Sequence, residues 1–221
     1  MLMLASHVFT VFLRWALGFL FLFFAFHTIL RLVRRYRKFP IPSILTELID
    51  NSVRRRYIQR PDVLADMMDL QPGMVVVEIG PGKGSFTKAV AERVLPGGIL
   101  FAIDIQESVI ERLIARVKRE GITNISPRVD DAYDLSFDDE SVDRVFAIAC
   151  LPEIPEPVRA LREFHRVLKP DGLLCLSELF MDADYPRRST EKRWAEETGF
   201  ALKEEFGSFF VYQLNFEKKT P

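Results

Sequence analysis

After Pro61, short apolar runs of strand length alternate with amphipathic stretches of helix length, and this alternation limits the fold more than any other feature. Strand-like runs span 74–79, which is rich in β-branched residues, 99–103, 125–129, 142–149 and 173–179, and two late strand-like runs span 201–206 and 209–216. Helical stretches occupy residues 62–68, 85–94, 107–119, 155–168 and 190–198. Strands separated by helices through short connections form a mostly parallel sheet with helices on both faces. The sequence therefore predicts a seven-stranded α/β domain over residues 61–221.

A glycine-rich loop, EIGPGKGS at residues 78–85, follows the first apolar run. Glycines at alternate positions let the backbone turn sharply and let a ligand approach it closely. The next helix begins directly and presents free N–H groups. Asp104 follows the second run, about 20 residues further on, where an acid accepts hydrogen bonds from ribose hydroxyls. This edge of the sheet is therefore predicted to bind a cofactor that contains a nucleoside.

The glycine spacing does not match the dinucleotide fingerprint G-x-G-x-x-G. The third glycine, Gly84, comes one residue early, and Ser85 stands where the fingerprint needs Gly or Ala. A nicotinamide-dependent oxidoreductase is therefore the less favoured interpretation of the loop.

The chain instead resembles the class I S-adenosylmethionine-dependent methyltransferases over roughly residues 61–217. Four segments carry the resemblance: VVVEIGPGKGSFT (75–87), LFAIDIQESVIERL (100–113), Asp131-Ala132, and SVDRVFAIACLPEIPEP with FHRVLKPDGLLCLSE (within 141–178). The resemblance implies a Rossmann-like fold, methyltransferase activity and S-adenosylmethionine as the cofactor. The run R-V-L-K-P-x-G is common in the branch that acts on small molecules and lipids.

The resemblance also implies a set of cofactor-binding residues. Gly80, Gly82 and Gly84 would line the methionine and ribose parts, and Glu78 would organise the loop or reach the amino group. Asp104 would hold the ribose, Ile105 the adenine face, and Asp131 with Ala132 the adenine edge. Asp131 is preferred to its neighbour Asp130 because an alanine follows it. The alternative for Glu78 is a loop-capping acid without contact to the cofactor.

The segment after the fourth strand bears on the methyl acceptor. Nucleic-acid base methyltransferases carry N-P-P-Y or N-L-P-Y there, whereas this chain has Cys150-Leu151-Pro152-Glu153. Residues 61–221 contain 20 basic and 29 acidic residues, a net charge of −9 that would repel phosphate. No nucleic-acid partner is therefore expected. Glu153 is the best candidate for a catalytic base, with a surface or helix-capping acid as the alternative reading.

The N-terminal part has the opposite character. Residues 8–30 are nearly all apolar apart from Arg14, and five basic residues fall within 31–38. Such a run is long enough to cross a bilayer core, and basic residues after it indicate a stop-transfer signal that faces the cytoplasm. A cleaved signal peptide or a buried core helix is the alternative. We expect a single-pass membrane anchor over residues 1–38 and a linker with a short basic helix over 39–60, where Arg54, Arg55, Arg56 and Arg60 cluster.

The two cysteines, Cys150 and Cys175, form neither a disulfide framework nor a Cys/His ligand cluster, so no metal site is expected. Together these features predict a membrane-anchored methyltransferase that acts on a lipid or apolar small molecule at the cytoplasmic face. A non-catalytic cofactor-binding protein of the same fold is the alternative from another functional class. The acceptor and the oligomeric state are not determined by the sequence.

Overall fold

The computed structural model describes residues 11, 13–15, 17–22, 24–25, 28–29, 31–33 and 52–219. The chain divides into two compact units, residues 1–38 and residues 39–221. In the first unit, the described residues are helical, and the Thr28 hydroxyl donates to the carbonyl of Phe24 at 2.8 Å, one helical turn earlier. Among the described residues, no helix has both the length and the apolar character that crossing a membrane requires.

The predicted membrane helix over residues 8–30 and the predicted linker and short basic helix over residues 39–60 lie partly outside the described residues. Both stay predictions. The described part of the second unit begins with a π-helix, η1 (Arg54–Ile58), in the stretch predicted as basic linker and helix.

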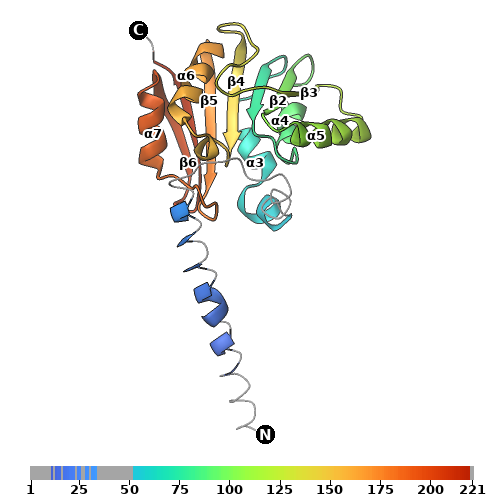
Figure 1. Ribbon diagram of the computed structural model, residues 1–221. Coiled ribbons are helices and arrows are strands. Elements are labelled where there is room, and N and C mark those ends of the chain that lie inside the picture. The colour runs from blue at the N-terminus through green and yellow to red at the C-terminus, as the bar shows by residue number, and fades with distance from the viewer. Residues whose placement is uncertain are drawn as a thin grey trace. The chain divides into compact units, whose positions relative to one another are not determined.

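A seven-stranded sheet forms the centre of the second unit (Figure 1). The strands are β1 (Val75–Ile79), β2 (Ile99–Asp104), β3 (Ile125–Val129), β4 (Val142–Ile148), β5 (Leu168–Leu179), β6 (Phe200–Gly207) and β7 (Val211–Lys218). Their order is β3-β2-β1-β4-β5-β7-β6. All neighbouring pairs are parallel except those of β7, which runs antiparallel between β5 and β6. The prediction of a mostly parallel, Rossmann-like sheet is confirmed.

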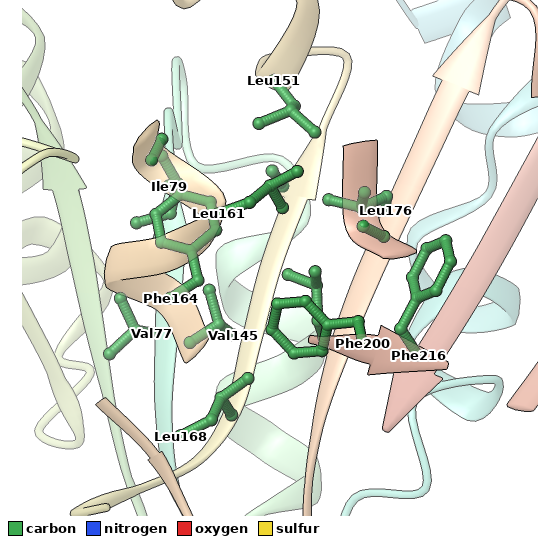
Figure 2. Close-up of a cluster of buried hydrophobic side chains, with 14 of the residues drawn as sticks. Val77, Ile79, Val145, Leu151, Leu161, Phe164, Leu168, Leu176, Phe200 and Phe216 are labelled. Carbon is green, nitrogen blue, oxygen red and sulfur yellow. The ribbon is translucent and has the colours of Figure 1, made fainter. Parts of the chain in front are cut away.

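Helices cover both faces of the sheet. The helices are α3 (Pro61–Asp66), α4 (Thr87–Arg93), α5 (Glu107–Glu120), the 3₁₀-helix η2 (Leu151–Glu153), α6 (Pro157–Val167) and α7 (Arg188–Glu196). One buried cluster packs α3, α4 and α5 against the sheet. The other packs α6 and α7 against the opposite face, and Figure 2 shows Phe164 of α6 beside Val77 and Val145 of the sheet. Because side chains alternate along a strand, β1 supplies Val76 to the first cluster and Val77 to the second.

β5 is longer than the sequence predicts. The sequence predicts a helix over 155–168 and a strand from residue 173, with Pro170 and Gly172 between them, yet the strand begins at Leu168. Leu168 pairs with Val142 and Leu173 with Arg144, so the extra residues of β5 bulge out between these two pairs. The bulge keeps Pro170 and Gly172 out of the regular hydrogen-bonded pairing of β5 with β4, which either residue would weaken.

Candidate functional site

A cavity of about 360 Å³ opens at the carboxyl ends of the parallel strands. Its walls come from the ends of β1, β2 and β4 and from the loop after β3. The chain runs outward from β1 to β2 and β3 on one side, and β4 and β5 continue on the other side. The gap between β1 and β4 is thus the topological switch point, the place where open α/β sheets bind their ligands.

The glycine loop forms one wall of the cavity through Gly80 and Gly82. Gly80 has φ +70°, and a Cβ placed on it would lie 2.3 Å from the sulfur of Cys150. Only glycine therefore lets the end of β4 come this close to the loop. Gly82 has φ +52°, and a Cβ placed on it would meet nothing within 4 Å. Its backbone is thus exposed to whatever occupies the cavity.

Two predicted cofactor residues, Glu78 and Gly84, lie next to the cavity but not among the residues that line it. Glu78 is 2% exposed at the end of β1. A Cβ on Gly84 would lie 2.5 Å from a methyl carbon of Leu113 in α5, so this glycine permits close packing of helix against loop. Their contact with a cofactor stays a prediction. Arg116 of α5 fixes the same loop by donating from Nη1 to the Lys83 carbonyl at 2.6 Å.

Asp104 ends β2 and lines the cavity, with Ile105 beside it. Burial raises the pKa of the Asp104 carboxyl, while a hydrogen bond from the Gln106 N–H and the charge of Arg112 oppose this effect. The Gln106 N–H donates to Oδ1 at 2.9 Å, which fixes the carboxyl orientation. Ile105 is 61% exposed, an unusual position for a large apolar side chain, and provides a flat apolar surface at the rim.

The loop after β3 places Asp130, Asp131 and Ala132 along the cavity wall. Both carboxylate oxygens of Asp130 accept hydrogen bonds from within this loop, from the N–H groups of Asp131 and Ser136. Within the described part of the chain, only Oδ1 of Asp131 is engaged, by the N–H of Tyr133 at 2.9 Å. Asp130 therefore shapes the loop, and Asp131 has an oxygen left for a ligand; its contact with a cofactor stays a prediction.

The other half of the cavity is assembled from three distant parts of the chain. Glu153, Ile154 and Pro155 come from η2 and the turn after it, Arg54 comes from η1, and Asp182 follows β5. The Arg54 guanidinium is buried, donates from Nε to Gln59 at 2.7 Å and lies 3.9 Å from the Asp182 carboxylate.

The backbone is strained where β4 enters the cavity wall. Ala149 has φ +52°, a conformation that costs a residue with a Cβ on the order of 1 kcal/mol or more. Its N–H donates to the Ser177 carbonyl of β5 at 2.8 Å. Cys150 follows, and burial together with nearby carboxylates raises the pKa of its thiol well above the usual range. This cysteine is therefore a neutral wall residue at physiological pH.

One member of a pair of buried carboxyls, Glu178, interacts electrostatically with the cavity residues Asp182 and Glu153. Glu178 at the end of β5 is 1% exposed, and Glu191 of α7 is fully buried. The Tyr212 hydroxyl lies 3.0 Å from Oε2 of Glu191. Burial raises the pKa of Glu191 to about 7, and burial and the nearby acids raise that of Glu178 well above its usual range. The pair therefore keeps a proton at neutral pH, because two adjacent buried carboxylates cannot both ionise.

The sequence pointed to Gly80, Gly82, Asp104, Ile105, Asp131, Ala132 and Glu153, all of which line the cavity. It also offered Asp182, after the fifth strand, as an edge of the acceptor pocket, and Asp182 lines the cavity too, whereas Arg54 was missed. The basic cluster at 54–60 was noted only for its charge. Nothing in the sequence signals that one of its four arginines turns inward to an acid 128 residues later. Among the residues the structure describes, no group of three or more His, Cys, Asp or Glu side chains could hold a metal ion.

The cavity fits S-adenosylmethionine better than a dinucleotide. Five carboxyl groups line it, from Asp104, Asp130, Asp131, Glu153 and Asp182, against two basic side chains, Arg54 and Lys83. This surplus of negative charge attracts a sulfonium cation and repels the pyrophosphate of a dinucleotide. The open space above Gly82 and the fixed carboxyl of Asp104 suit a ribose.

Comparison with known proteins agrees with this fit. Residues 77–176 match the family described as "Methyltransferase domain". The chain is 32% identical to a nocamycin O-methyltransferase of Saccharothrix syringae, over 52% of this chain and 41% of that protein. It is 33% identical to a demethylmenaquinone methyltransferase of Geobacillus stearothermophilus, over 57% of this chain and 53% of that protein. The chain thus spans about half the length of the curated relatives it matches.

Among solved structures, a SAM-dependent methyltransferase from Aquifex aeolicus superposes with a TM-score of 0.74 at 19% identity, covering 80% of this chain and 98% of that one. At this identity the likeness establishes the fold alone. Residues 77–176 are thus similar to a methyltransferase domain, and the cavity that this stretch helps to line fits S-adenosylmethionine as the cofactor.

Proposed function

We propose that this protein is a membrane-anchored methyltransferase that transfers a methyl group from S-adenosylmethionine to a lipid or apolar small molecule at the cytoplasmic face. The observation that carries the proposal is one continuous cavity, in which the cofactor residues of the glycine loop and Asp104 face an acceptor half formed by Ile154, Pro155 and Glu153. The run of apolar residues at 8–30 and the basic residues after it support the anchor.

Bound S-adenosylmethionine supplies an electrophilic methyl group on a positively charged sulfur. The protein's part is to align the acceptor and to keep water out, which together account for much of the rate of such displacements. Apolar residues around the cavity, such as Phe86, Val109 and Ile148, serve the exclusion of water. A surplus of carboxylates stabilises the charged cofactor and favours it over the neutral product that remains after transfer.

A general base is needed only for an acceptor that is protonated at neutral pH, such as a phenol, a thiol or an ammonium group. Glu153 fits this role, because it lines the acceptor half and its N–H is held by the Cys150 carbonyl at 3.0 Å. Asp182 lines the same half and is charge-paired with Arg54. Glu153 would take the proton that leaves the acceptor.

The relatives support an apolar acceptor with an ionisable hydroxyl or an activated ring carbon. Two of them are named for methylation of demethylmenaquinone and of nocamycin. A lipid-soluble acceptor would also account for a chain in which residues 8–30 are nearly all apolar. Amines of phospholipid headgroups and small thiols remain compatible with the same cavity.

The test is incubation of the purified full-length protein with radiolabelled S-adenosylmethionine and a membrane extract, followed by separation of the lipids. We expect label in an organic-soluble product, and loss of that label in Glu153→Gln with retained binding of S-adenosylhomocysteine. Label confined to water-soluble products would rule out a lipid acceptor.

Calorimetry separates the proposed function from its alternatives. Binding of S-adenosylhomocysteine without binding of NAD supports the methyltransferase, whereas binding of NAD alone would overturn it. Binding of S-adenosylhomocysteine with no methyl transfer to any fraction of the extract would instead support a non-catalytic cofactor-binding protein.

A further inference from the structure

Large apolar side chains are exposed together on one part of the second unit. Between residues 52 and 219, the structure describes ten exposed large apolar side chains. Six of the ten belong to three segments: Val53, Tyr57 and Ile58 at η1, Met181 after β5, and Phe209 and Phe210 between β6 and β7. Tyr57 is 72% exposed, Phe209 61% and Phe210 63%. Apolar surface gathered in this way marks an interaction site more often than scattered apolar residues do.

Direct contacts join the three segments into one surface, which we call the aromatic rim (residues 53–58, 180–182 and 207–211). The Phe180 ring lies 5.1 Å from that of Phe209 and 5.7 Å from that of Phe210. The Phe180 N–H also donates to the Phe210 carbonyl at 2.8 Å. On the other side, Arg54 of η1 lies 3.9 Å from Asp182. In Figure 1, η1 and the β6–β7 turn both lie at the lower end of the domain.

The charge of the rim is basic, unlike that of the domain around it. Within the rim, Arg56 is exposed and Arg55 is half-buried. Just outside it, Arg60 is exposed and paired with Asp62, and Arg187 is exposed directly before α7. Three nearby acids form ion pairs, Asp182 with Arg54, Asp62 with Arg60, and Glu205 with both Arg188 and Lys192. A fourth acid, Asp184, is half-buried. Residues 61–221 as a whole have a net charge of −9. A local basic surface therefore stands out on an acidic domain.

Exposed aromatic rings beside arginines match the chemistry of an anionic bilayer surface. Tyrosine rings sit at the level of the headgroups, and phenylalanine side chains bury at the boundary between headgroups and acyl chains. Each basic residue near an anionic leaflet contributes on the order of 1 kcal/mol of attraction. An acidic protein partner would match the arginines but would leave the two adjacent phenylalanines of the β6–β7 turn without a reason to be exposed.

The rim also borders the mouth of the functional cavity, since Arg54 and Asp182 belong to both. We propose that the aromatic rim docks on an anionic lipid bilayer, so that the acceptor half of the cavity opens toward the membrane. An apolar acceptor dissolved in the bilayer then reaches Ile154 and Pro155 without crossing water. This inference deepens the proposed function, on which it rests, by assigning a membrane-binding surface separate from residues 8–30.

The test uses the full-length protein with vesicles of phosphatidylcholine alone and of phosphatidylcholine mixed with phosphatidylglycerol. Amide hydrogen exchange is measured by mass spectrometry on peptides that cover 53–58 and 207–211. We expect exchange of both segments to slow several-fold with the mixed vesicles relative to phosphatidylcholine, and this difference to shrink at high salt. The loop at 138–141, after β3 and before the start of β4, serves as the internal control and should not change.

A double variant, Phe209→Ser with Phe210→Ser, should lose the protection of 53–58 and keep its affinity for S-adenosylhomocysteine. Leu202→Ser, which removes an exposed apolar side chain of β6 outside the rim, is the matched control and should behave as the parent protein. If the double variant does not fold, the exchange of the parent protein decides alone.

Equal exchange of the rim with both vesicle types would overturn the proposal. The proposal would also be overturned if, without vesicles, amide exchange of the rim slowed as the protein concentration rose. That result would favour contact between copies of the chain. Methyl transfer to an organic-soluble product by the same protein would show that the proposed function stands even if the rim does not bind lipid.

Discussion

At the scale of single residues, Gly80 is the position where the site tolerates least change. Gly80→Ala would place a Cβ 2.3 Å from the Cys150 sulfur at φ +70°. We expect a loss of roughly 2 to 5 kcal/mol from strain and overpacking, with weaker binding of S-adenosylhomocysteine. Thermal unfolding and calorimetry measure the two effects.

Two further variants separate the causes. Cys150→Ala in the Gly80→Ala background should recover part of the stability, because the sulfur is gone while the strained φ remains. Gly82→Ala meets no atom within 4 Å, so it should cost only about 1 kcal/mol of stability while weakening cofactor binding. A Gly80→Ala protein as stable as its parent would contradict the close approach of β4 to the loop.

The buried Glu191 predicts a pH dependence of stability. Its pKa is about 7 in the folded protein, against 4.5 for an unperturbed glutamate. Below pH 4.5 the carboxyl is protonated in both states and contributes nothing. Between pH 4.5 and 7 the unfolded chain releases the proton that the folded chain keeps, so the free energy of unfolding falls by roughly 1 kcal/mol for each pH unit.

Glu191→Gln should therefore flatten the stability profile between pH 5 and 7 and make the protein more stable than its parent at pH 8. Urea unfolding at a series of pH values measures this. An unchanged profile in the variant would show that Glu191 is not the titrating group. Thr190→Ala, one residue away and half-buried, controls for a general effect of substitution in α7.

At the scale of elements, α5 holds the glycine loop in place. Arg116 donates to the Lys83 carbonyl and pairs with Glu120 one turn later at 2.8 Å. Arg116→Ala should cost about 1.5 to 3 kcal/mol of stability, the usual range for a hydrogen bond that involves a charged group, and raise the dissociation constant of S-adenosylhomocysteine several-fold.

Arg119→Ala is the matched control for this prediction, because Arg119 is an exposed arginine on the same helix. It should leave both quantities unchanged. Equal effects of the two substitutions would show that the helix charge, and not the contact with the loop, supports cofactor binding.

At the scale of the whole molecule, the charge of the chain is divided. Residues 1–60 carry a net charge of +8 and residues 61–221 a net charge of −9. The boundary between the two compact units, after Lys38, falls within the basic part. Deletion of residues 1–38 should give a soluble protein that binds S-adenosylhomocysteine as tightly as the full chain, as measured by sedimentation and calorimetry.

If the shortened protein still sediments with every type of vesicle, residues 8–30 are not the main attachment to the membrane. Sedimentation with anionic vesicles alone would instead point to the aromatic rim. The two membrane-binding elements are thus distinguished by their dependence on lipid charge.

The sequence by itself determined the succession of strands and helices along the chain, the glycine loop and the position of the acid Asp104. These features are local, because a strand, a tight turn and a helix start are set by neighbouring residues, and parallel strands bring their carboxyl ends to one edge. β5 was predicted five residues too short because a proline and a glycine normally interrupt a strand, and only pairing with β4 made room for the bulge.

Only the tertiary structure decided which distant side chains meet. Arg54 faces Asp182, Glu178 lies beside Glu191, and Phe180 joins Phe209, and no periodicity connects the members of these pairs. Such contacts depend on how helices pack on the two faces of the sheet and on how β7 inserts between β5 and β6. The sequence therefore predicts where the cofactor binds, whereas the acceptor half and the aromatic rim follow from packing, because their residues come together only when the whole domain has folded.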